Sequence, residues 1–185
     1  MSMGVLPDTN EAYGAKEYWD QRYSQETENS DFDWFKSYKD LAEILHELIP
    51  NRMSRILMLG CGNSKLSEDM WEDGYKHIVN TDYSKVLVEN MKQRHGEARP
   101  EMEWYEMDVR DLKFDEESFD VAIDKGTMDA MMTIKGDVWD PPEQVIRDCN
   151  KEVDEALRRV KSPSRLSHHL IKAKECFAKV DLLFI

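Results

Sequence analysis

The chain has 185 residues, which is about the length of one domain. It carries 25 Lys and Arg residues against 38 Asp and Glu residues, for a net charge of −13, and 41% of its residues are hydrophobic. This composition is typical of an acidic globular protein, and the negative charge argues against binding nucleic acid through the phosphate backbone. A basic protein is the macromolecular partner that the charge favours.

The sequence contains no pattern typical of membrane insertion or secretion. No run approaches the roughly 18 apolar residues that cross a bilayer, and residues 1–8 lack the basic and apolar regions of a signal peptide. We therefore expect a cytoplasmic protein, with the nucleus as the alternative, and no membrane partner. Cys61, Cys149 and Cys176 are widely spaced, which predicts reduced thiols and neither a disulfide nor a metal site. Cys61 as a nucleophile remains an alternative.

The N-terminal part of the chain changes character twice. Residues 1–15 are polar and without periodicity, which predicts a flexible leader. An aromatic and acidic segment follows, in which Trp19 and Tyr23 are four residues apart and would share one helical face. Ser37 then predicts the start of a helix whose apolar residues recur at helical spacing until Pro50.

From residue 55 onward, short apolar runs alternate with amphipathic segments. Strands are expected near 56–59, 78–81, 102–107 and 119–123, and helices near 64–72 and 84–94. This alternation predicts an α/β protein with a Rossmann-like open, mainly parallel sheet and helices on both of its faces.

The alternation breaks after residue 157. Asp140 and the two prolines after it predict the start of a helix that continues to Leu157, but no turn and buried strand follow directly. Residues 158–185 carry seven Lys and Arg residues against two acids, a charge of +5, which leaves −18 on the rest. The expected division is a flexible leader at 1–15, an incomplete domain at 16–157 and a divergent basic tail at 158–185. The sheet is thus expected to be truncated after the fourth strand and its helix, with an exposed edge unless 180–185 pairs there.

Three features at the ends of expected strands point to a ligand. Gly60 and Gly62 lie between the first strand and a helix, where glycines let the backbone approach a ligand. Asp82 lies 22 residues after Gly60, at the end of the second strand, where a carboxylate can accept hydrogen bonds from both ribose hydroxyls. Asp108 and Val109 follow the third strand, within reach of an adenine amino group. Together they predict an adenosine-type cofactor, and the alternative for each Asp is the cap of a turn or helix.

A fourth feature follows the fourth expected strand. Asp124, Lys125 and Thr127 stand where the carboxyl end of that strand would direct them to the same crevice as Gly60 and Asp82. A charged segment at this position predicts a functional role, and a solvated turn remains the alternative.

These segments resemble those of a known family. The chain resembles the seven-strand (class I) S-adenosylmethionine-dependent methyltransferases in Leu57-Met58-Leu59-Gly60-Cys61-Gly62-Asn63-Ser64, Thr81-Asp82-Tyr83-Ser84, Met107-Asp108-Val109 and Asp124-Lys125-Gly126-Thr127-Met128-Asp129-Ala130. With Tyr18-Trp19-Asp20-Gln21-Arg22-Tyr23 and Asp33-Trp34-Phe35, it is similar to the methyltransferase-like protein 13 group and the related lysine methyltransferase of translation elongation factor 1-alpha. The resemblance covers about residues 16–157. Two departures are Met58, where many members have an acid, and the missing last three strands.

The resemblance implies a methyltransferase that transfers a methyl group from S-adenosylmethionine to a protein lysine, with elongation factor 1-alpha as the implied substrate. It implies that the cofactor is bound by Trp19, Tyr23, Trp34, Gly60, Gly62, Asp82, Tyr83, Asp108, Val109 and Lys125. No metal is expected. The cluster of Asp111, Asp115, Glu116 and Glu117 suits a basic protein substrate, although such runs are also typical of a solvated face.

The role of Asp124 is a hypothesis, and two other functions remain as alternatives. Methyl transfer is an in-line displacement that depends mainly on positioning, and we hypothesise that Asp124 helps to orient the acceptor amine. A non-catalytic cofactor-binding or interaction module, or an inactive truncated isoform, is one alternative, because the later strands are missing. An NAD-dependent oxidoreductase is the other, against which the aromatic N-terminal segment and residues 124–130 argue.

Overall fold

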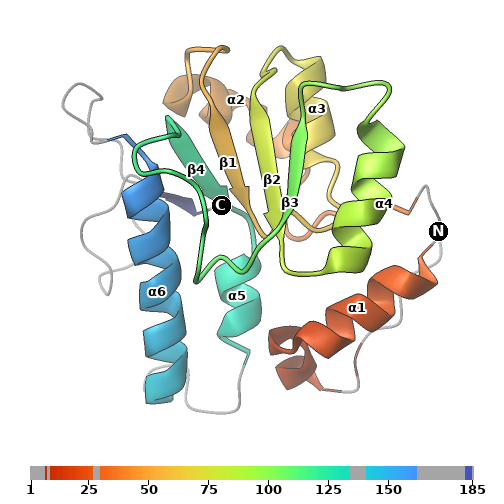
Figure 1. Ribbon diagram of the computed structural model, residues 1–185, viewed down its shortest axis with the longest axis vertical. Helices are drawn as coiled ribbons and strands as arrows, with labels where there is room; N and C mark the ends of the chain where they lie inside the picture. The colour runs from red at the N-terminus through yellow and green to blue at the C-terminus, as the bar shows by residue number, and fades with distance from the viewer. Residues whose placement is uncertain (1–6, 8, 27–29, 134–140, 162–181, 185) are drawn as a thin grey trace.

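The computed structural model describes residues 7, 9–26, 30–133, 141–161 and 182–184, and Figure 1 shows an open sheet flanked by helices. The strands are β1 (Ile56–Leu59), β2 (Ile78–Asp82), β3 (Glu103–Glu106), β4 (Val121–Asp124) and β5 (Leu182–Phe184). Their order is β3-β2-β1-β4-β5, and every neighbouring pair is parallel. The expected Rossmann-like α/β fold is confirmed.

Helices lie between β1 and β2 and between β2 and β3, as the alternating pattern predicted, and the others precede β1 or follow β4. The helices are η1 (Asn10–Gly14, a 3-10 helix), α1 (Lys16–Gln25), α2 (Tyr38–Leu48), α3 (Leu66–Glu72), α4 (Lys85–His95), α5 (Thr127–Met131) and α6 (Glu143–Arg159). Within the described residues, no helix combines the length and the apolar character that a membrane span requires.

The sheet does not have the exposed edge at β4 that was expected for a sheet truncated after the fourth strand. Instead of ending at β4, the sheet continues with β5, whose Leu182 pairs with Ala122 and whose Phe184 pairs with Asp124. The pairing of 180–185 with the fourth strand, left open above, is therefore what the structure shows for Leu182–Phe184. Helix α6 continues past the predicted boundary at residue 157 to Arg159, and most of the predicted tail lies outside the described residues.

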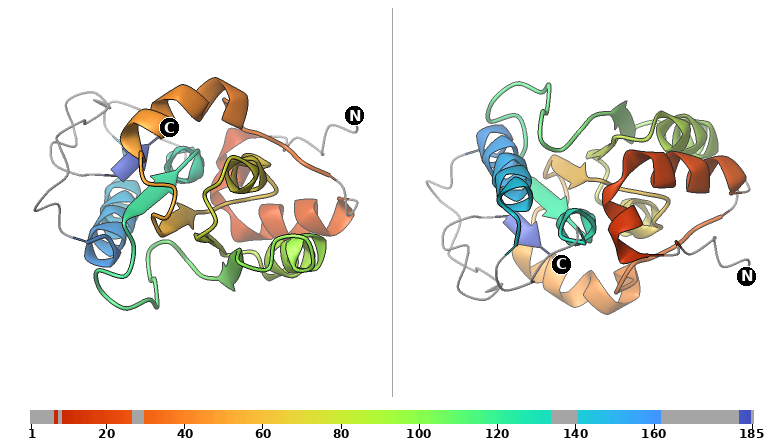
Figure 2. Two further views of the ribbon diagram at one scale, coloured as in Figure 1. Left: turned by 90° about the horizontal axis from the view of Figure 1, so that it is seen from above. Right: turned by 90° about the horizontal axis from the view of Figure 1, so that it is seen from below.

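Both faces of the sheet are covered, and every residue of β1 is therefore buried. Ile56 and Met58 belong to the apolar cluster formed with α1 to α4, and Leu57 and Leu59 belong to the cluster that includes Ala156 of α6. Side chains alternate between the faces of a strand, so a strand buried on both faces has to be apolar throughout. Figure 2 shows α2 and α6 on opposite sides of the sheet.

Two helix starts are fixed by polar side chains. The Asp40 carboxylate accepts a hydrogen bond from the Ser37 backbone amide at 3.0 Å, as expected for a helix that begins after Ser37. The Ser84 hydroxyl accepts from the Leu87 amide at 3.4 Å, so α4 begins directly after β2. Beyond the carboxyl ends of the strands lie α1 and α5 (Figure 1). In open α/β sheets, ligands bind at this end, in the crevice where the connections that follow two neighbouring strands go to opposite faces of the sheet.

Candidate functional site

The loop after β1 has a backbone that only glycine adopts easily. Gly60 has φ +60° and Gly62 has φ +53°, both in the left-handed region. A Cβ atom on Gly60 would lie 2.1 Å from the Thr127 Oγ1 atom, and one on Gly62 would lie 3.2 Å from the Tyr23 hydroxyl. The two glycines therefore let the loop pass against α5 on one side and α1 on the other.

A buried carboxylate stands next to this loop at the end of β2. Asp82 accepts hydrogen bonds from the Gly62 amide at 3.1 Å and from the Ser84 amide at 2.9 Å. Burial raises the pKa of Asp82 to about 6, and the two amides oppose that rise. Burial and the neighbouring Asp82 charge also raise the pKa of the Cys61 thiol, which argues against Cys61 as a thiolate nucleophile.

The segment after β4 contributes a buried cation. The Lys125 ammonium donates to the Trp34 carbonyl oxygen at 3.0 Å and lies 3.4 Å from the Asp33 carboxylate. Burial lowers the pKa of Lys125, and Asp33 opposes this effect. The Thr127 hydroxyl donates to the Leu59 carbonyl oxygen at 2.8 Å, which fastens the first turn of α5 to the end of β1.

Aromatic rings from α1 and the following segment form the opposite wall. The Trp19 and Tyr23 rings are stacked with centroids 5.7 Å apart, and the Trp34 ring lies 6.1 Å from Trp19 in an edge-on arrangement. The buried Arg22 guanidinium lies 5.0 Å from the centre of the Phe32 ring and 5.7 Å from that of Trp34. Cation–π attraction therefore joins the helix to the segment that carries Phe32 and Trp34.

A bridging carboxylate links this aromatic wall to the glycine loop. Glu26 accepts from the Arg22 guanidinium at 3.1 Å and from the Asn63 side-chain amide at 2.7 Å. The wall and the loop are therefore held at a fixed separation by one side chain that contacts both.

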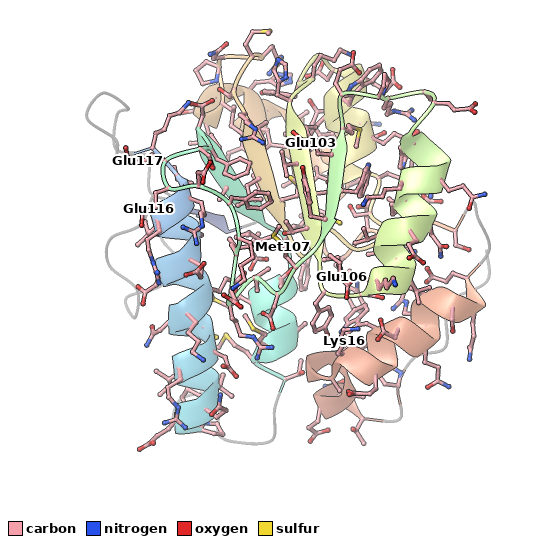
Figure 3. All side chains as sticks on the ribbon, in the orientation of Figure 1. Lys16, Glu103, Glu106, Met107, Glu116 and Glu117 are labelled. Carbon is pink, nitrogen blue, oxygen red and sulfur yellow. The ribbon has the colours of Figure 1, made fainter. Side chains whose placement is uncertain are left out.

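These parts enclose a cavity of about 310 Å³. Met107, one of its residues, is labelled at the lower end of β3 in Figure 3, and Lys16 is labelled in α1. All ten residues predicted to hold a cofactor line it: Trp19, Tyr23, Trp34, Gly60, Gly62, Asp82, Tyr83, Asp108, Val109 and Lys125. Segments far apart in the sequence thus meet in one cavity at the carboxyl ends of the strands.

Comparison with known proteins decides the family. A family profile described as "Methyltransferase domain" matches residues 56–149, which is half of the chain. The chain belongs to this family of methyltransferase domains. Among curated relatives, "eEF1A lysine and N-terminal methyltransferase" of Mus musculus is 39% identical over 84% of this chain and 21% of its own length. "EEF1A lysine methyltransferase 4" of Mus musculus is 37% identical over 83% of this chain and 59% of its own length. The chain thus spans a fifth to three fifths of these relatives.

Solved structures share the fold of this methyltransferase domain. The PH0226 protein of Pyrococcus horikoshii OT3 matches with a TM-score of 0.56 and 20% identity, over 80% of this chain and 62% of its own. Phosphoethanolamine N-methyltransferase 1 of Haemonchus contortus, solved with phosphoethanolamine and S-adenosylhomocysteine, matches with a TM-score of 0.54 and 16% identity, over 83% and 30%. At these identities the likeness concerns the fold alone.

S-adenosylmethionine is the cofactor that the family implies, and the cavity residues of the methyltransferase domain fit it. Gly60 and Gly62 both line the cavity, and neither places a side chain between the loop backbone and a ligand. Asp82 places a carboxylate at the end of β2, where ribose hydroxyls can donate to it. The aromatic wall of Trp19, Tyr23 and Trp34 suits a positively charged sulfonium.

Asp124 is the predicted site residue that the structure places outside the cavity lining. Its side chain is 1% exposed, and its two carboxylate oxygens accept from the Thr127 amide at 2.8 Å and the Met128 amide at 2.9 Å. The expectation that Asp124 faces the same crevice as Gly60 is wrong, because its position on β4 turns the carboxylate toward the start of α5. Its hypothesised effect on the acceptor stays a prediction, and it would act through α5.

The Asp108 side chain lines the cavity but is already paired. Its carboxylate accepts from the Arg110 guanidinium at 2.6 Å and from the Arg110 amide at 2.9 Å, and Arg110 also lies 3.3 Å from Asp148 of α6. These bonds hold the pKa of Asp108 below its ordinary value, although burial alone would raise it. Sequence reasoning missed Arg110, because an ion pair across two residues leaves no pattern in the sequence.

Other cavity residues missed from the sequence come from three regions. Tyr13 lies in η1, within the segment expected to be a loose leader, and Phe32 and Phe35 flank the predicted Trp34. Asp129 lies in the quoted segment after β4, so its neighbourhood could have indicated it, and Thr127, which the sequence did place at this crevice, also lines the cavity. Within the described residues, no group of His, Cys, Asp and Glu side chains is arranged to hold a metal ion, and Cys61 and Cys149 are free thiols.

Proposed function

We propose that this chain transfers a methyl group from S-adenosylmethionine to a lysine side chain of a basic protein, with elongation factor 1-alpha as the candidate substrate. The observation that carries the proposal is the cavity that joins the glycine loop, Asp82 and the wall formed by Trp19, Tyr23 and Trp34. The acceptor class comes from the relatives, whose names specify the lysine methylation of eEF1A.

The cofactor supplies a methyl group bound to a positively charged sulfur, which leaves the protein to bind, align and exclude water. The glycine loop and Asp82 bind and orient the adenosine and amino-acid parts. The stacked rings of Trp19 and Tyr23 line the cavity, where they would exclude water and attract the positive charge through their π-systems.

A lysine acceptor has to lose a proton before its nitrogen can attack. Asp129 is an exposed residue of α5 that lines the cavity, so its carboxylate can attract the incoming ammonium. The opening beside Asp129 also gives the ammonium proton a path to solvent. Phe35, which is 66% exposed and has φ +61°, provides an apolar surface on the same rim for the lysine methylenes.

Electrostatic attraction supports a basic partner. The first 157 residues carry a charge of −18, which favours approach of a positively charged protein. The acidic residues of 111–117 are not among those that line the cavity. Figure 3 labels two of them, Glu116 and Glu117, beside the upper end of α6, away from α1 and α5. Among the residues that the structure describes, the acids that line the cavity are Asp82, Asp108 and Asp129.

The experiment that tests the proposal incubates the full chain with S-adenosylmethionine and purified elongation factor 1-alpha. Tryptic mass spectrometry then locates any added methyl group, and calorimetric titrations with S-adenosylhomocysteine and with NAD measure cofactor choice. Binding of S-adenosylhomocysteine with lysine methylation supports the proposal. Binding without transfer to this or other basic proteins would indicate a cofactor-binding module, and binding of NAD alone would indicate an oxidoreductase.

As part of the same proposal, we place the activity in the cytoplasm, where elongation factor 1-alpha serves translation. Fluorescence imaging of a tagged chain tests this placement. Accumulation in the nucleus would contradict it and would favour a nuclear basic protein as the substrate.

A further inference from the structure

One fully buried acid, Glu152, accepts no hydrogen bond from any described donor. Glu152, on the inner side of α6, is 0% exposed, and neither of its side-chain oxygens has a hydrogen-bond partner among the described groups that carry a proton. Its carboxyl group instead faces that of Asp124 at the end of β4. Two ionised carboxylates present only acceptor atoms, so a hydrogen bond between them requires a proton on one of them.

The proton belongs on Glu152. Burial raises the pKa of Asp124 as well, but both of its oxygens accept backbone amides, from Thr127 and Met128, and these bonds favour its ionised form. Glu152 has no such amide. Burial and the adjacent Asp124 charge raise the pKa of Glu152 to about 10.

The hydrogen bonds continue from Asp124 to the glycine loop. Asp124 holds the first amides of α5, and the hydroxyl of Thr127 in that turn donates to the Leu59 carbonyl oxygen at 2.8 Å. Thr127 also fills the space beside Gly60, where a Cβ atom would overlap its side chain. A connected path therefore runs from α6 through β4 and α5 to the edge of the cavity.

We propose that Glu152 is a positioning residue: as a protonated acid it donates a hydrogen bond to Asp124 and thereby keeps Thr127 and the Gly60 loop in the arrangement that binds the cofactor. This inference rests on the proposed function, because it takes the cavity to be the S-adenosylmethionine site. Removing the donor would leave Asp124 facing an acceptor or an apolar group, and the start of α5 would shift.

Other charged groups near the pair do not replace this donor. Asp108 and Arg110 face Glu152 from the loop after β3, but the Arg110 guanidinium is shared by Asp108 at 2.6 Å and Asp148 at 3.3 Å. From α6 itself come Asp148 and the Cys149 thiol, whose pKa rises to about 11 through burial and the nearby acids. On α5, Asp129 adds negative charge beside Asp124. The described surroundings therefore leave Glu152 itself as the donor to Asp124.

The test compares three variants of the full chain by calorimetric titration with S-adenosylhomocysteine. E152Q keeps a donor to Asp124, and E152M keeps the side-chain length but removes the hydrogen bond. D154N is the matched control, because Asp154 is an exposed acid on the same helix. We expect E152Q and D154N to bind within twofold of the wild type and E152M to bind at least fivefold more weakly, while thermal unfolding shows that each variant is folded.

Equal affinity of E152M and wild type would overturn the inference while leaving the proposed function intact, as would an equal loss in E152Q and E152M. Failure of the wild-type chain to bind would overturn the proposed function and the inference with it. If E152M does not fold, T127V tests the other end of the path, because it removes the donor to the Leu59 carbonyl oxygen. We expect T127V to weaken binding at least fivefold, and wild-type affinity in T127V would overturn the inference.

Discussion

The Asp82 carboxylate accepts a hydrogen bond from the Gly62 amide across 3.1 Å, which ties the end of β2 to the loop after β1. A second bond from the Ser84 amide at 2.9 Å fixes the other oxygen at the start of α4. Asp82 also lines the cavity. The geometry of the loop and the binding of a ligand therefore depend on the same ionisable group.

This relationship predicts that cofactor binding weakens in mild acid. Burial raises the pKa of Asp82 to about 6, so at pH 5 roughly nine in ten Asp82 groups are protonated, and a protonated carboxyl accepts fewer hydrogen bonds. We expect the dissociation constant for S-adenosylhomocysteine to rise by up to about tenfold per pH unit below pH 6. Calorimetry from pH 5 to 8 measures it.

The control for this pH dependence is D82N, which does not titrate. We expect this variant to bind at least tenfold more weakly than the wild type at pH 7.5 and with little dependence on pH. A wild-type affinity that stays constant from pH 5 to 8 would contradict the role of Asp82.

The glycine loop allows a paired test of strain and space. Gly60 and Gly74 both have positive φ angles, +60° and +102°, but a Cβ atom on Gly60 meets Thr127 at 2.1 Å whereas one on Gly74 lies 3.9 Å from Arg52. We expect G74A to lower the free energy of unfolding by about 1–2 kcal/mol, the cost of a left-handed non-glycine residue. G60A should lower it by clearly more and also weaken S-adenosylhomocysteine binding. Urea unfolding of both variants checks this. An equal decrease in the free energy of unfolding would show that the overlap between the new Cβ atom and Thr127 does not destabilise G60A.

How much of this site the sequence predicts depends on whether a residue acts through local spacing. Gly60, Gly62 and Asp82 follow strands in a fixed order, so the spacing of the motifs was enough to place them at one edge of the sheet. The orientation of Asp124 was not predictable, because it depends on which amides α5 presents to it.

The fifth strand and the buried Arg22 show the same limit. The sequence indicated 180–185 as a segment that could pair with the fourth strand, but the pairing itself is a contact between segments separated by more than fifty residues. Arg22 lies among Trp19, Phe32 and Trp34, and a charged residue in that position reads from the sequence as a surface residue of a helix. Contacts between distant segments decide both features.

The aromatic wall predicts a fluorescence signal on ligand binding. Trp19 and Trp34 line the cavity, whereas Trp71 and Trp104 do not. We expect S-adenosylhomocysteine to change the tryptophan emission of the wild type and of a W71F variant. The change should be largely lost in a variant with both W19F and W34F. An unaltered signal in that double variant would place the ligand elsewhere.

Asp129 predicts a separation between acceptor and cofactor effects. The residue is exposed at the cavity, so D129N should raise the KM for a basic protein substrate about three- to tenfold by removing attraction for the ammonium, while S-adenosylhomocysteine affinity changes less than twofold. E116Q is the matched control, since Glu116 lies beside the upper end of α6 (Figure 3). Equal KM values for D129N and E116Q would remove Asp129 from the acceptor site.

The buried Glu152 predicts how stability depends on pH. In the unfolded chain a Glu releases its proton near pH 4.5, whereas burial and the Asp124 charge raise the pKa of Glu152 in the folded chain to about 10. The folded state therefore binds more protons than the unfolded state between these values, so rising pH favours unfolding. The slope from this group approaches about 1.4 kcal/mol per pH unit in that window.

E152Q removes this titration without removing the donor to Asp124. Its advantage in the free energy of unfolding over the wild type should therefore grow as the pH rises from 5 to 9, and urea unfolding at each pH measures it. D154N, an exposed substitution on the same helix, should give a curve parallel to that of the wild type. A parallel curve for E152Q as well would mean that Glu152 is ionised in the folded protein, and the carboxyl pair with Asp124 would then lack its shared proton.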